Sequence, residues 1–298
     1  MGQRRYAEDY TSAELMAVVA SREIRNGEKV FVGIGVPMIA GFLALYTHAP
    51  DAVLVFEGGY VGGRPPTACT DVGDSSLGHQ AFYITSLWRV FSDLQRGYFD
   101  LAIIGAAQID RYGNVNSTAI FGSGDYQQPD LRLPGSGGAN DMASSARRTI
   151  IMTRLERRRF VEKLDYLTSP GFLRGGRSRW EAGLLGGGPS AVITDKAVFR
   201  FTREGEMFLS EVYPGVSVGE VEGQVGWKLR KAERLRVVEP PTLEEVEFIR
   251  SFDPTDVILR GVRLFERMSF KEWVEAVEES LRKVKSKTLN KQRSPEKL

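Results

Sequence analysis

The sequence predicts an α/β fold in which a mostly parallel, open sheet lies between layers of helices. Short apolar runs bounded by turn residues recur along the chain, as expected of strands that are covered on both faces. Helical segments separate most of these runs, and this alternation is typical of the α/β class. The last part of the chain has an amphipathic helical pattern of its own, which predicts a C-terminal helical extension.

The first helix is predicted to begin at a capping box. Thr11 can accept a hydrogen bond from the helix backbone, and Glu14 lies where its side chain can reach back to residue 11. We expect this helix to end at Asn26 and Gly27, since this pair is a common C-terminal signal.

The chain is organised around residues 29–59. A short apolar strand at 30–32 leads into a glycine-rich turn, and Pro37 suits the first turn of the helix that follows at 38–46. A second apolar strand at 53–56 completes the unit, and it is expected to lie beside the first in a parallel sheet.

Gly33 and Gly35 follow the first of these strands, and Glu57, Gly58 and Gly59 follow the second. Ligands of open parallel sheets bind at the carboxyl ends of the strands. Because both groups of residues lie at such ends, they form the candidate active site.

The loop at 58–78, rich in Gly, Pro, Thr and Asp, is expected to cover this site because loops of that length are usually functional or disordered. The other predicted elements are strands at 101–105, 149–152 and 191–194, a helix at 88–95, a tight turn at 110–114, a glycine-rich loop at 134–140, a hairpin from 199–201 and 207–209, a helical pattern from 217 onward, and amphipathic helices at 242–249 and 270–284. We expect an α/β domain at 1–240, the helical extension at 241–284 and a basic, disordered tail at 285–298.

Composition narrows the class of protein. A net charge of +2 makes no case for nucleic acid as a partner. No apolar run is long enough to cross a bilayer, and the start of the chain lacks a signal-peptide pattern, so no membrane association is expected. The single cysteine, Cys69, excludes an internal disulfide and fits a cytoplasmic location.

A dinucleotide fingerprint is not favoured. Gly33 and Gly35 follow a strand and Glu57 lies at about the spacing of a ribose-binding acid, but Met38 stands where the third glycine of the pattern belongs. Metal and hydrolase patterns are also missing. His48 and His79 lie at no metal-ligand spacing, and neither a nucleophile elbow nor a phosphate-binding P-loop is present.

Two interpretations of Glu57 therefore remain. A glutamate after an apolar strand is often a surface residue or a member of an ion pair. Alternatively, its carboxylate acts as a nucleophile on an acyl carbon, which divides one difficult step into two easier ones. Such chemistry needs backbone N–H donors at the developing oxyanion, and glycine turns bring bare backbone close. Two such turns are present, at Gly33 and Gly35 and at Gly137 and Gly138.

Several longer motifs resemble one known family. The chain resembles the β subunits of class I CoA-transferases, most closely those of glutaconate CoA-transferases, from about residue 10 to about residue 196. The motifs that carry the resemblance are GIGVP at 33–37, VFEGG at 55–59, GAAQIDRYGNVNST at 105–118, GSGGAN at 135–140 and LDYLTSPG at 164–171.

The resemblance implies an enzyme that moves CoA from an acyl-CoA to a carboxylic acid, with no permanently bound cofactor and no metal. Glu57 matches the family's nucleophile, which forms an acyl anhydride and then a glutamyl-CoA thioester in ping-pong kinetics. Gly33, Gly35 and Pro37, together with Gly137, Gly138 and Ala139 of the second loop, match segments that border the CoA and anhydride site. Gly58 and Gly59 are a candidate substrate loop. The family pairs an α with a β subunit, so the resemblance implies an α partner in a hetero-oligomer, expected to be α2β2 or larger.

Gly58 departs from the pattern, since the family usually has Ser or Asn after the glutamate. The departure removes a side-chain hydrogen bond near the carboxylate and leaves acceptor specificity open. Two alternatives remain. A related group of α/β pairs hydrolyses C–C bonds in CoA thioesters during steroid ring degradation, but its β subunits lack the glutamate and the intact GSGGA segment. The other alternative is a subunit that binds CoA without catalysis.

Overall fold

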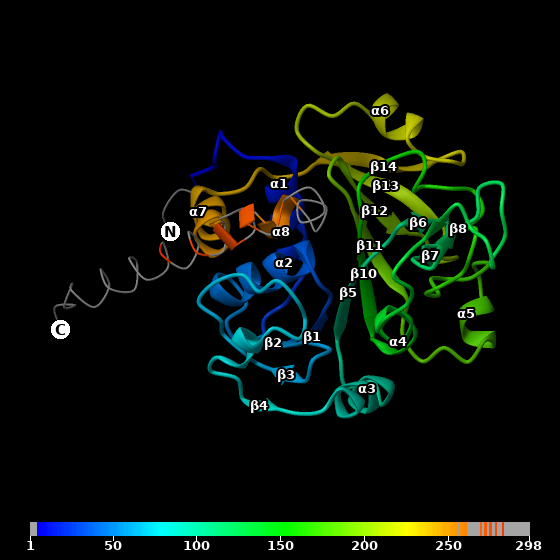
Figure 1. The fold of residues 1–298 in the computed structure, drawn as a ribbon. Helices are drawn as coiled ribbons and strands as arrows, with labels where there is room; N and C mark the ends of the chain where they lie inside the picture. The colour runs from blue at the N-terminus through cyan, green and yellow to red at the C-terminus, as the bar shows by residue number, and fades with distance from the viewer. Residues whose placement is uncertain are drawn as a thin grey trace.

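The computed structural model describes residues 5–254 and 257–260, and further along the chain positions 269, 271–272, 274–275, 278 and 282. Within this part, ten strands form one sheet (Figure 1). In spatial order they are β14 (Arg230–Val237), β13 (Met207–Val212), β12 (Ala197–Phe201), β11 (Pro189–Ile193), β10 (Arg148–Met152), β5 (Leu101–Gly105), β1 (Lys29–Val32), β2 (Val53–Val55), β3 (Tyr60–Val61) and β4 (Tyr83–Ile84).

The centre of the sheet, from β11 to β2, is parallel throughout. Antiparallel pairs flank it, with β3 and β4 on one side and the β12–β13 hairpin on the other. The prediction of a mostly parallel sheet is confirmed, and so is that of a hairpin at 199–201 and 207–209. Two small antiparallel ribbons, β6 (Gln108–Ile109) with β7 (Val115–Asn116) and β8 (Ala119–Ile120) with β9 (Leu131–Arg132), lie outside the main sheet.

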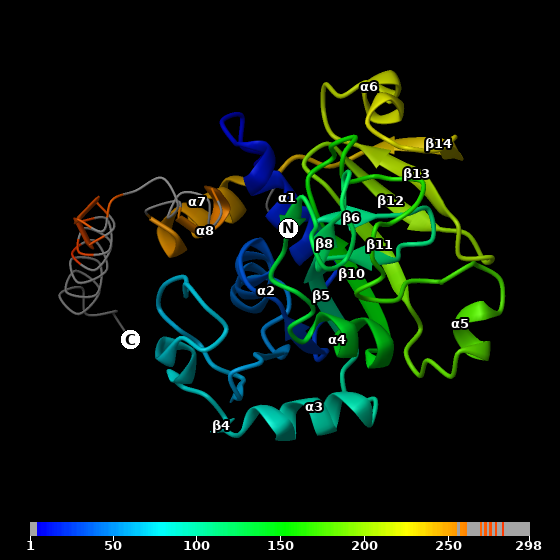
Figure 2. The same cartoon turned by 45° about the vertical axis from the view of Figure 1, so that its right-hand side comes forward.

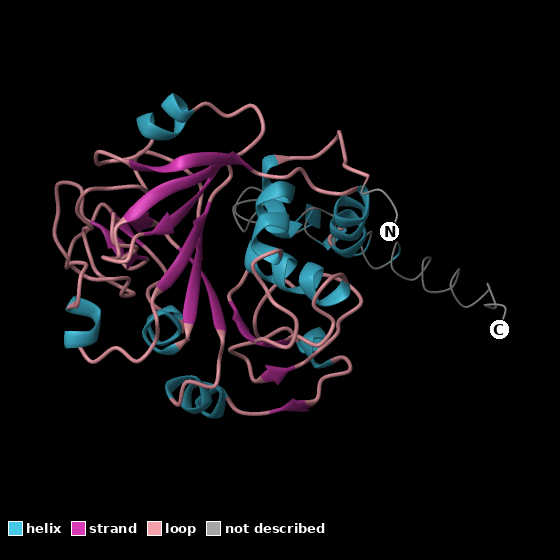
Figure 3. Ribbon diagram, turned by 180° about the vertical axis from the view of Figure 1, so that it is seen from behind, coloured by secondary structure: helices cyan, strands magenta, loops and turns pink. Residues whose placement is uncertain are grey.

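Helices cover both faces of the sheet (Figure 3). On one side lie α1 (Ser12–Ser21), α2 (Val36–Tyr46), α7 (Leu243–Phe252) and α8 (Val257–Arg260), and on the other lie α3 (Leu87–Gln95) and α4 (Ala139–Ser145). Alternate residues of a strand point to opposite layers: Val30 and Leu54 belong to the core with α1 and α2, whereas Phe31 and Val55 belong to the core with α3 and α4. This two-sided burial explains why the central strands are continuously apolar.

The segment after residue 240 returns to the first layer of helices. The ring of Phe252 in α7 lies 5.2 Å from the ring of Phe42 in α2. Arg250 Nε donates to Glu14 Oε1 of α1 at 2.7 Å, and Ala7 N donates to Pro241 O at 2.9 Å. The two ends of the described chain are thus joined across this layer. The predicted helix at 270–284 and the tail at 285–298 fall largely outside the described residues.

Three predicted boundaries were wrong. The first helix begins at the expected capping box but ends at Ser21, not at Asn26 and Gly27, which lie in a later turn. The segment at 58–78 is not a structureless loop, because it contributes β3 to the sheet and a 3₁₀ helix, η1 (Ser75–Gly78).

The prediction of helix from residue 217 onward was also wrong beyond α6 (Val218–Gly223), because residues 230–237 form strand β14. This edge strand is largely exposed, so it lacks the apolar alternation by which a strand is recognised. Ion pairs to neighbouring strand residues support it instead, including Arg236 Nη2 to Glu211 Oε1 at 2.6 Å and Arg230 Nε to Glu206 Oε2 at 3.1 Å.

Candidate active site

Glu57 lies in the tight turn between β2 and β3. Gly59 N donates to Phe56 O at 2.9 Å and Phe56 N donates to Tyr60 O at 3.0 Å, which closes a hairpin loop with Glu57 at its tip. Gly59 has a φ of +94°, and a Cβ there would lie 1.8 Å from Thr85 O, so only glycine fits. The turn therefore fixes the backbone that carries Glu57.

The strands β1 and β2 are parallel neighbours, with Phe31 opposite Val55. Gly33 and Glu57 each follow two residues later, so the predicted meeting of the two groups at one sheet edge is confirmed. Gly33 N donates to Ile103 O of β5 at 3.0 Å, and a Cβ on Gly33 would approach that same oxygen to 2.8 Å.

Pro37 occupies the first turn of α2, as expected, and the residue that caps this helix is Gly35, with a φ of +85°. An added Cβ on Gly35 would meet no atom within 4 Å, so its surface is open. Within the described chain, no acceptor takes the N–H of Gly35.

The second glycine loop reaches the Glu57 carboxylate. A Cβ on Gly138 would lie 3.1 Å from Glu57 Oε2 and 2.8 Å from Phe91 Cζ, so the absence of a side chain lets the carboxylate approach the loop. Gly137 has a φ of +47° and open space around it, and Ala139 begins α4. Among the described residues, no acceptor takes a hydrogen bond from the backbone N–H of Gly137 or of Gly138.

The Glu57 side chain is partly buried and has, among the described residues, neither a hydrogen bond nor an ion pair. This does not match the interpretation of Glu57 as an ion-pair member. A partly buried carboxylate beside unused backbone N–H groups has the arrangement expected of a nucleophile whose oxyanion intermediates need donors.

Gly58 is constrained by packing. Its N–H donates to Val72 O at 3.2 Å, and an added Cβ would lie 2.6 Å from Val72 O and 2.9 Å from the Cα of Gly73. The segment that follows the hairpin thus folds back onto the turn that carries Glu57. This contact gives a physical reason for glycine where a polar residue was expected.

A polar network holds the loop that contains Gly137 and Gly138. Gly135 N donates to Ser117 O at 2.9 Å, and Ser117 Oγ donates to Gly135 O at 2.8 Å. The hydroxyl of Thr168 accepts a hydrogen bond from Ser117 N at 2.9 Å, and the carbonyl oxygen of Thr168 accepts one from Asn140 Nδ2 at 2.7 Å. The buried Asn116 extends the network by accepting from Thr118 N at 2.9 Å.

The turn at 110–114 is confirmed and has a structural role. Asp110 accepts from Tyr112 N and from both nitrogens of Asn114, while Asn114 Oδ1 accepts from Gly171 N at 2.8 Å. Burial raises the pKa of the Asp110 carboxyl above its ordinary value, although these hydrogen bonds oppose the shift. The turn joins two of the sequence motifs.

The sequence reasoning missed Phe91 and Thr168. Phe91 lies in the helix predicted at 88–95, and its contact with Gly138 has no local signal. Thr168 belongs to the motif at 164–171, whose place in the sequence had suggested importance without a role.

Two further findings concern the described residues as a whole. No three histidine, cysteine, aspartate or glutamate side chains among them converge as a metal site would require. None of their helices combines the length and apolar character needed to span a bilayer.

Known proteins match most of this chain. The family model for coenzyme A transferase matches residues 13–224. The B subunit of 3-oxoadipate CoA-transferase from Pseudomonas knackmussii is 38% identical over 254 residues, covering 85% of this chain and 96% of that protein. The B subunit of glutaconate CoA-transferase from Acidaminococcus fermentans is 36% identical over 264 residues, with coverages of 85% and 96%.

Solved structures give the same result. The crystal structure of glutaconate coenzyme A-transferase from Acidaminococcus fermentans aligns with a TM-score of 0.78 at 36% identity, over 85% of this chain and 98% of that chain. The decarboxylase AibA/AibB aligns with a TM-score of 0.71 at 26% identity, over 83% and 96%.

These matches define the class of the molecule, which is an enzyme chain of the CoA-transferase type. The chain belongs to the coenzyme A transferase family. Two relatives with which it shares more than a third of the aligned residues are B subunits by name.

Proposed function

We propose that this chain is the β subunit of an acyl-CoA:carboxylate CoA-transferase and that Glu57 is its covalent nucleophile. The observation that carries the proposal is the approach of Gly138 to Glu57 Oε2, where an added Cβ would lie only 3.1 Å away. This approach places the Glu57 carboxylate beside the second glycine loop. The carboxylate is partly buried and has no ion pair among the described residues, and the backbone N–H groups of that loop have no acceptor among them.

The reaction proceeds in four balanced steps. A Glu57 oxygen attacks the thioester carbon of the acyl-CoA, and CoA thiolate leaves, which gives an acyl-glutamyl anhydride. The thiolate attacks the glutamyl carbon and the donor acid leaves as a carboxylate, which gives the glutamyl-CoA thioester. The acceptor carboxylate attacks the glutamyl carbon of this thioester, and CoA thiolate leaves, which gives a new anhydride. CoA thiolate then attacks the acceptor's acyl carbon and restores Glu57.

Each attack produces a tetrahedral oxyanion, which the protein must stabilise. The N–H groups of Gly137 and Gly138 are candidate donors on one side of Glu57, and that of Gly35 is a candidate donor at the same sheet edge. Backbone donors held in place before the reaction are the most effective kind, because they need no reorganisation as charge develops.

The proposal includes an α subunit. The relatives at 38% and 36% identity are each named as the B subunit of their enzyme, which implies a partner for each of them, and we extend that partnership to this chain. Their names carry 3-oxoadipate and glutaconate, so a substrate panel should begin with dicarboxylic acids and then include monocarboxylic acids. Packing against Val72 and Gly73 favours Gly58 on structural grounds, so this glycine does not argue for a subunit that has lost catalysis.

The test is intact-mass spectrometry of the chain, co-expressed with its α subunit, after incubation with acyl-CoAs and then borohydride. Reduction of a glutamyl-CoA thioester turns the Glu57 carboxyl carbon into a primary alcohol, which leaves a permanent mass decrease in that residue's peptide. We expect this change in the wild type and neither the change nor CoA transfer in Glu57→Gln.

Other outcomes would contradict the proposal. Free CoA that accumulates without an acceptor acid, and without the mass change, would assign the chain to the hydrolases. Release of CO₂ would assign it to the decarboxylases, whose member AibA/AibB shares this fold. Transfer that survives in Glu57→Gln would exclude Glu57 as the nucleophile.

A further inference from the structure

A group of large apolar side chains is exposed on the segment that runs from β4 through α3. Six of them, each between 52% and 70% exposed, fall within residues 82–98. They are Phe82, Tyr83, Ile84, Leu87, Trp88 and Tyr98. Ile84 pairs with Tyr60, which packs on the layer of α1 and α2, so its side chain lies on the other face of the sheet from Tyr83. We call the other five the β4–α3 patch. In Figure 2, β4 and α3 follow one another along the lower margin of the molecule. Single exposed apolar residues are ordinary, whereas several of them on one short segment favour a binding surface.

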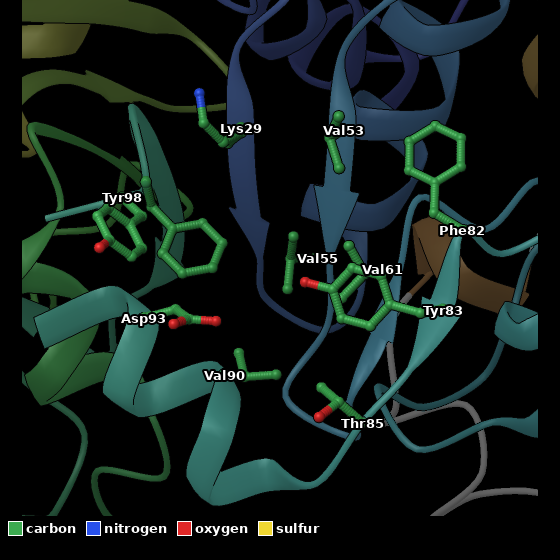
Figure 4. Close-up of a pocket in the computed structure, with 11 residues that line it drawn as sticks. Lys29, Val53, Val55, Val61, Phe82, Tyr83, Thr85, Val90, Asp93 and Tyr98 are labelled. Atoms are coloured by element: carbon green, nitrogen blue, oxygen red, sulfur yellow. The ribbon is translucent and has the colours of Figure 1, made fainter. Parts of the chain in front are cut away.

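A pocket of about 300 Å³ opens within this patch. Val53 and Val55 of β2 line it from the sheet, and Figure 4 shows Phe82 and Tyr83 on one side with Val90, Asp93 and Tyr98 on the other. The pocket suits an apolar anchor side chain from a partner, since such anchors in desolvated pockets carry most of the energy of an interface.

One polar atom of this wall is left without a partner. Asp93 Oδ2 accepts from Arg89 Nε at 2.9 Å, but Asp93 Oδ1 is buried and has no hydrogen bond among the described residues. Buried acceptors are normally satisfied. Solvent does not reach this oxygen, so a donor on a partner does not reach it either, and the pocket suits the apolar body of an aromatic side chain.

The patch also includes an open edge of the sheet. Among the described strands, β4 is the last in the spatial order and pairs with β3 alone. Both of its residues, Tyr83 and Ile84, are exposed and uncharged. Exposed apolar edges invite pairing with another chain, and proteins usually protect them with charges or with a covering element.

The patch is continuous with the turn that carries Glu57. Thr85, directly after β4, donates its N–H to Gly59 O at 2.9 Å. Phe91 of α3 lies against Gly138, the glycine that borders the Glu57 carboxylate. A partner seated on the patch would therefore lie beside the catalytic turn.

The size of the patch fits a folded subunit. With about 150–250 Å² for each large side chain, the exposed fractions of these five amount to roughly 450–750 Å². A standard protein–protein interface buries about 800 Å² on each partner, so the patch supplies most of the apolar part of such an interface.

We propose that the β4–α3 patch is the surface on which the α subunit docks, with an aromatic side chain of that subunit in the pocket. The inference rests on the proposed function, because that function supplies the α subunit. It adds the location of the interface and places the partner next to Glu57, where it can complete the walls of the active site.

The test uses charge-introducing variants of the co-expressed pair. Trp88→Glu changes the patch, Phe82→Glu changes the wall of the pocket, and Trp180→Glu is the matched control, because Trp180 in α5 (Ser178–Glu181) is also 70% exposed but lies outside the patch. Association is measured by sedimentation velocity over a concentration series. Thermal melting of each free chain checks that the variants fold.

We expect Trp88→Glu and Phe82→Glu each to weaken association with the α subunit by at least about 30-fold, and Trp180→Glu to stay within about twofold. Hydrogen exchange at 82–98 should slow in the wild-type complex. Wild-type association of the two patch variants with no such slowing would overturn the proposal, as would a wild-type pair that never associates.

The outcome for the patch is separable from the outcome for the function. A wild-type pair that transfers CoA while the patch variants still associate contradicts the docking surface alone. A wild-type pair that associates through the patch but transfers no CoA contradicts the proposed function alone. If the chain by itself dimerises, and Trp88→Glu abolishes that dimer but leaves the α complex intact, the occupant is a second copy of this chain and the proposal fails.

Discussion

Replacement of Gly138 by alanine tests whether this glycine borders the reacting carboxylate. Gly138 has φ −78° and ψ −6°, a conformation that alanine adopts freely, so the substitution adds a methyl group without backbone strain. That methyl group would lie 2.8 Å from Phe91 Cζ and 3.1 Å from Glu57 Oε2, whereas carbon atoms in contact prefer about 3.5–4.0 Å. The ring and the carboxylate must therefore retreat by several tenths of an ångström.

The size of the effect follows from this displacement. Misplacement of a reacting group by about 1 Å can cost on the order of 100-fold in rate, so we expect kcat of Gly138→Ala to fall by about 10- to 100-fold. Overpacking of this kind should also lower the free energy of unfolding by about 1–3 kcal/mol. Steady-state CoA transfer with the α subunit present measures the first effect, and urea unfolding of the free chain measures the second.

Two further variants separate the contacts. In the double variant Gly138→Ala/Phe91→Leu, the ring end that meets the new methyl group is gone. Stability should recover relative to the two single changes, while kcat should stay low because the contact with Glu57 remains. The control is Gly219→Ala, at a helical position where an added Cβ meets no atom within 4 Å, and its rate should be unchanged. Wild-type kcat in Gly138→Ala would refute the argument.

Three other predictions concern the surroundings of the site. Gly58→Ser should lower the free energy of unfolding by about 1–3 kcal/mol, because its Cβ would lie 2.6 Å from Val72 O; an unchanged urea midpoint would show that the 58–78 segment does not pack there. Thr168→Val removes the hydroxyl that accepts from Ser117 N, so it should lower kcat and reduce the free energy of unfolding by about 1–3 kcal/mol. Thr168→Ser keeps a hydroxyl and should leave both quantities near wild type. Burial tends to raise the pKa of Glu14, but the hydrogen bonds from Arg250 and Thr11 and the charge of Arg250 together outweigh burial and lower that pKa from 4.5. The pair should therefore stabilise the fold above about pH 4.5 and lose that effect as pH falls through the folded pKa, so the difference in Tm between wild type and Glu14→Gln should be large at pH 7 and shrink below pH 4.5; a difference that does not depend on pH would contradict this.

Residues 29–59 were predictable because each signal there is local. The length of an apolar run indicates a buried strand, Pro37 indicates a first helical turn, and Gly35 supplies the positive φ that the turn before the helix requires. The place of Glu57 at the carboxyl end of its strand then follows from the general geometry of parallel sheets.

The features that escaped prediction depend on contacts between distant parts of the chain. β14 is a strand because β13 offers it a partner and opposite charges, and nothing in its own mostly charged sequence distinguishes it from an exposed helix. The role of Thr168 arises from hydrogen bonds to a motif about fifty residues earlier, which no local spacing reveals. Gly58 could be recognised as unusual, but Val72, which explains it, could not be identified from the sequence.

The packing of α7 against α1 and α2 has a consequence for the order in which the protein is made. Phe42 and Glu14 leave the ribosome early, but Phe252 and Arg250, which cover them, follow about 200 residues later. At about 5–20 residues per second, this delay lasts roughly 10–40 s. During that time one face of the nascent sheet has its first two helices but not the third, so the N-terminal layer is completed only after α7 has left the ribosome.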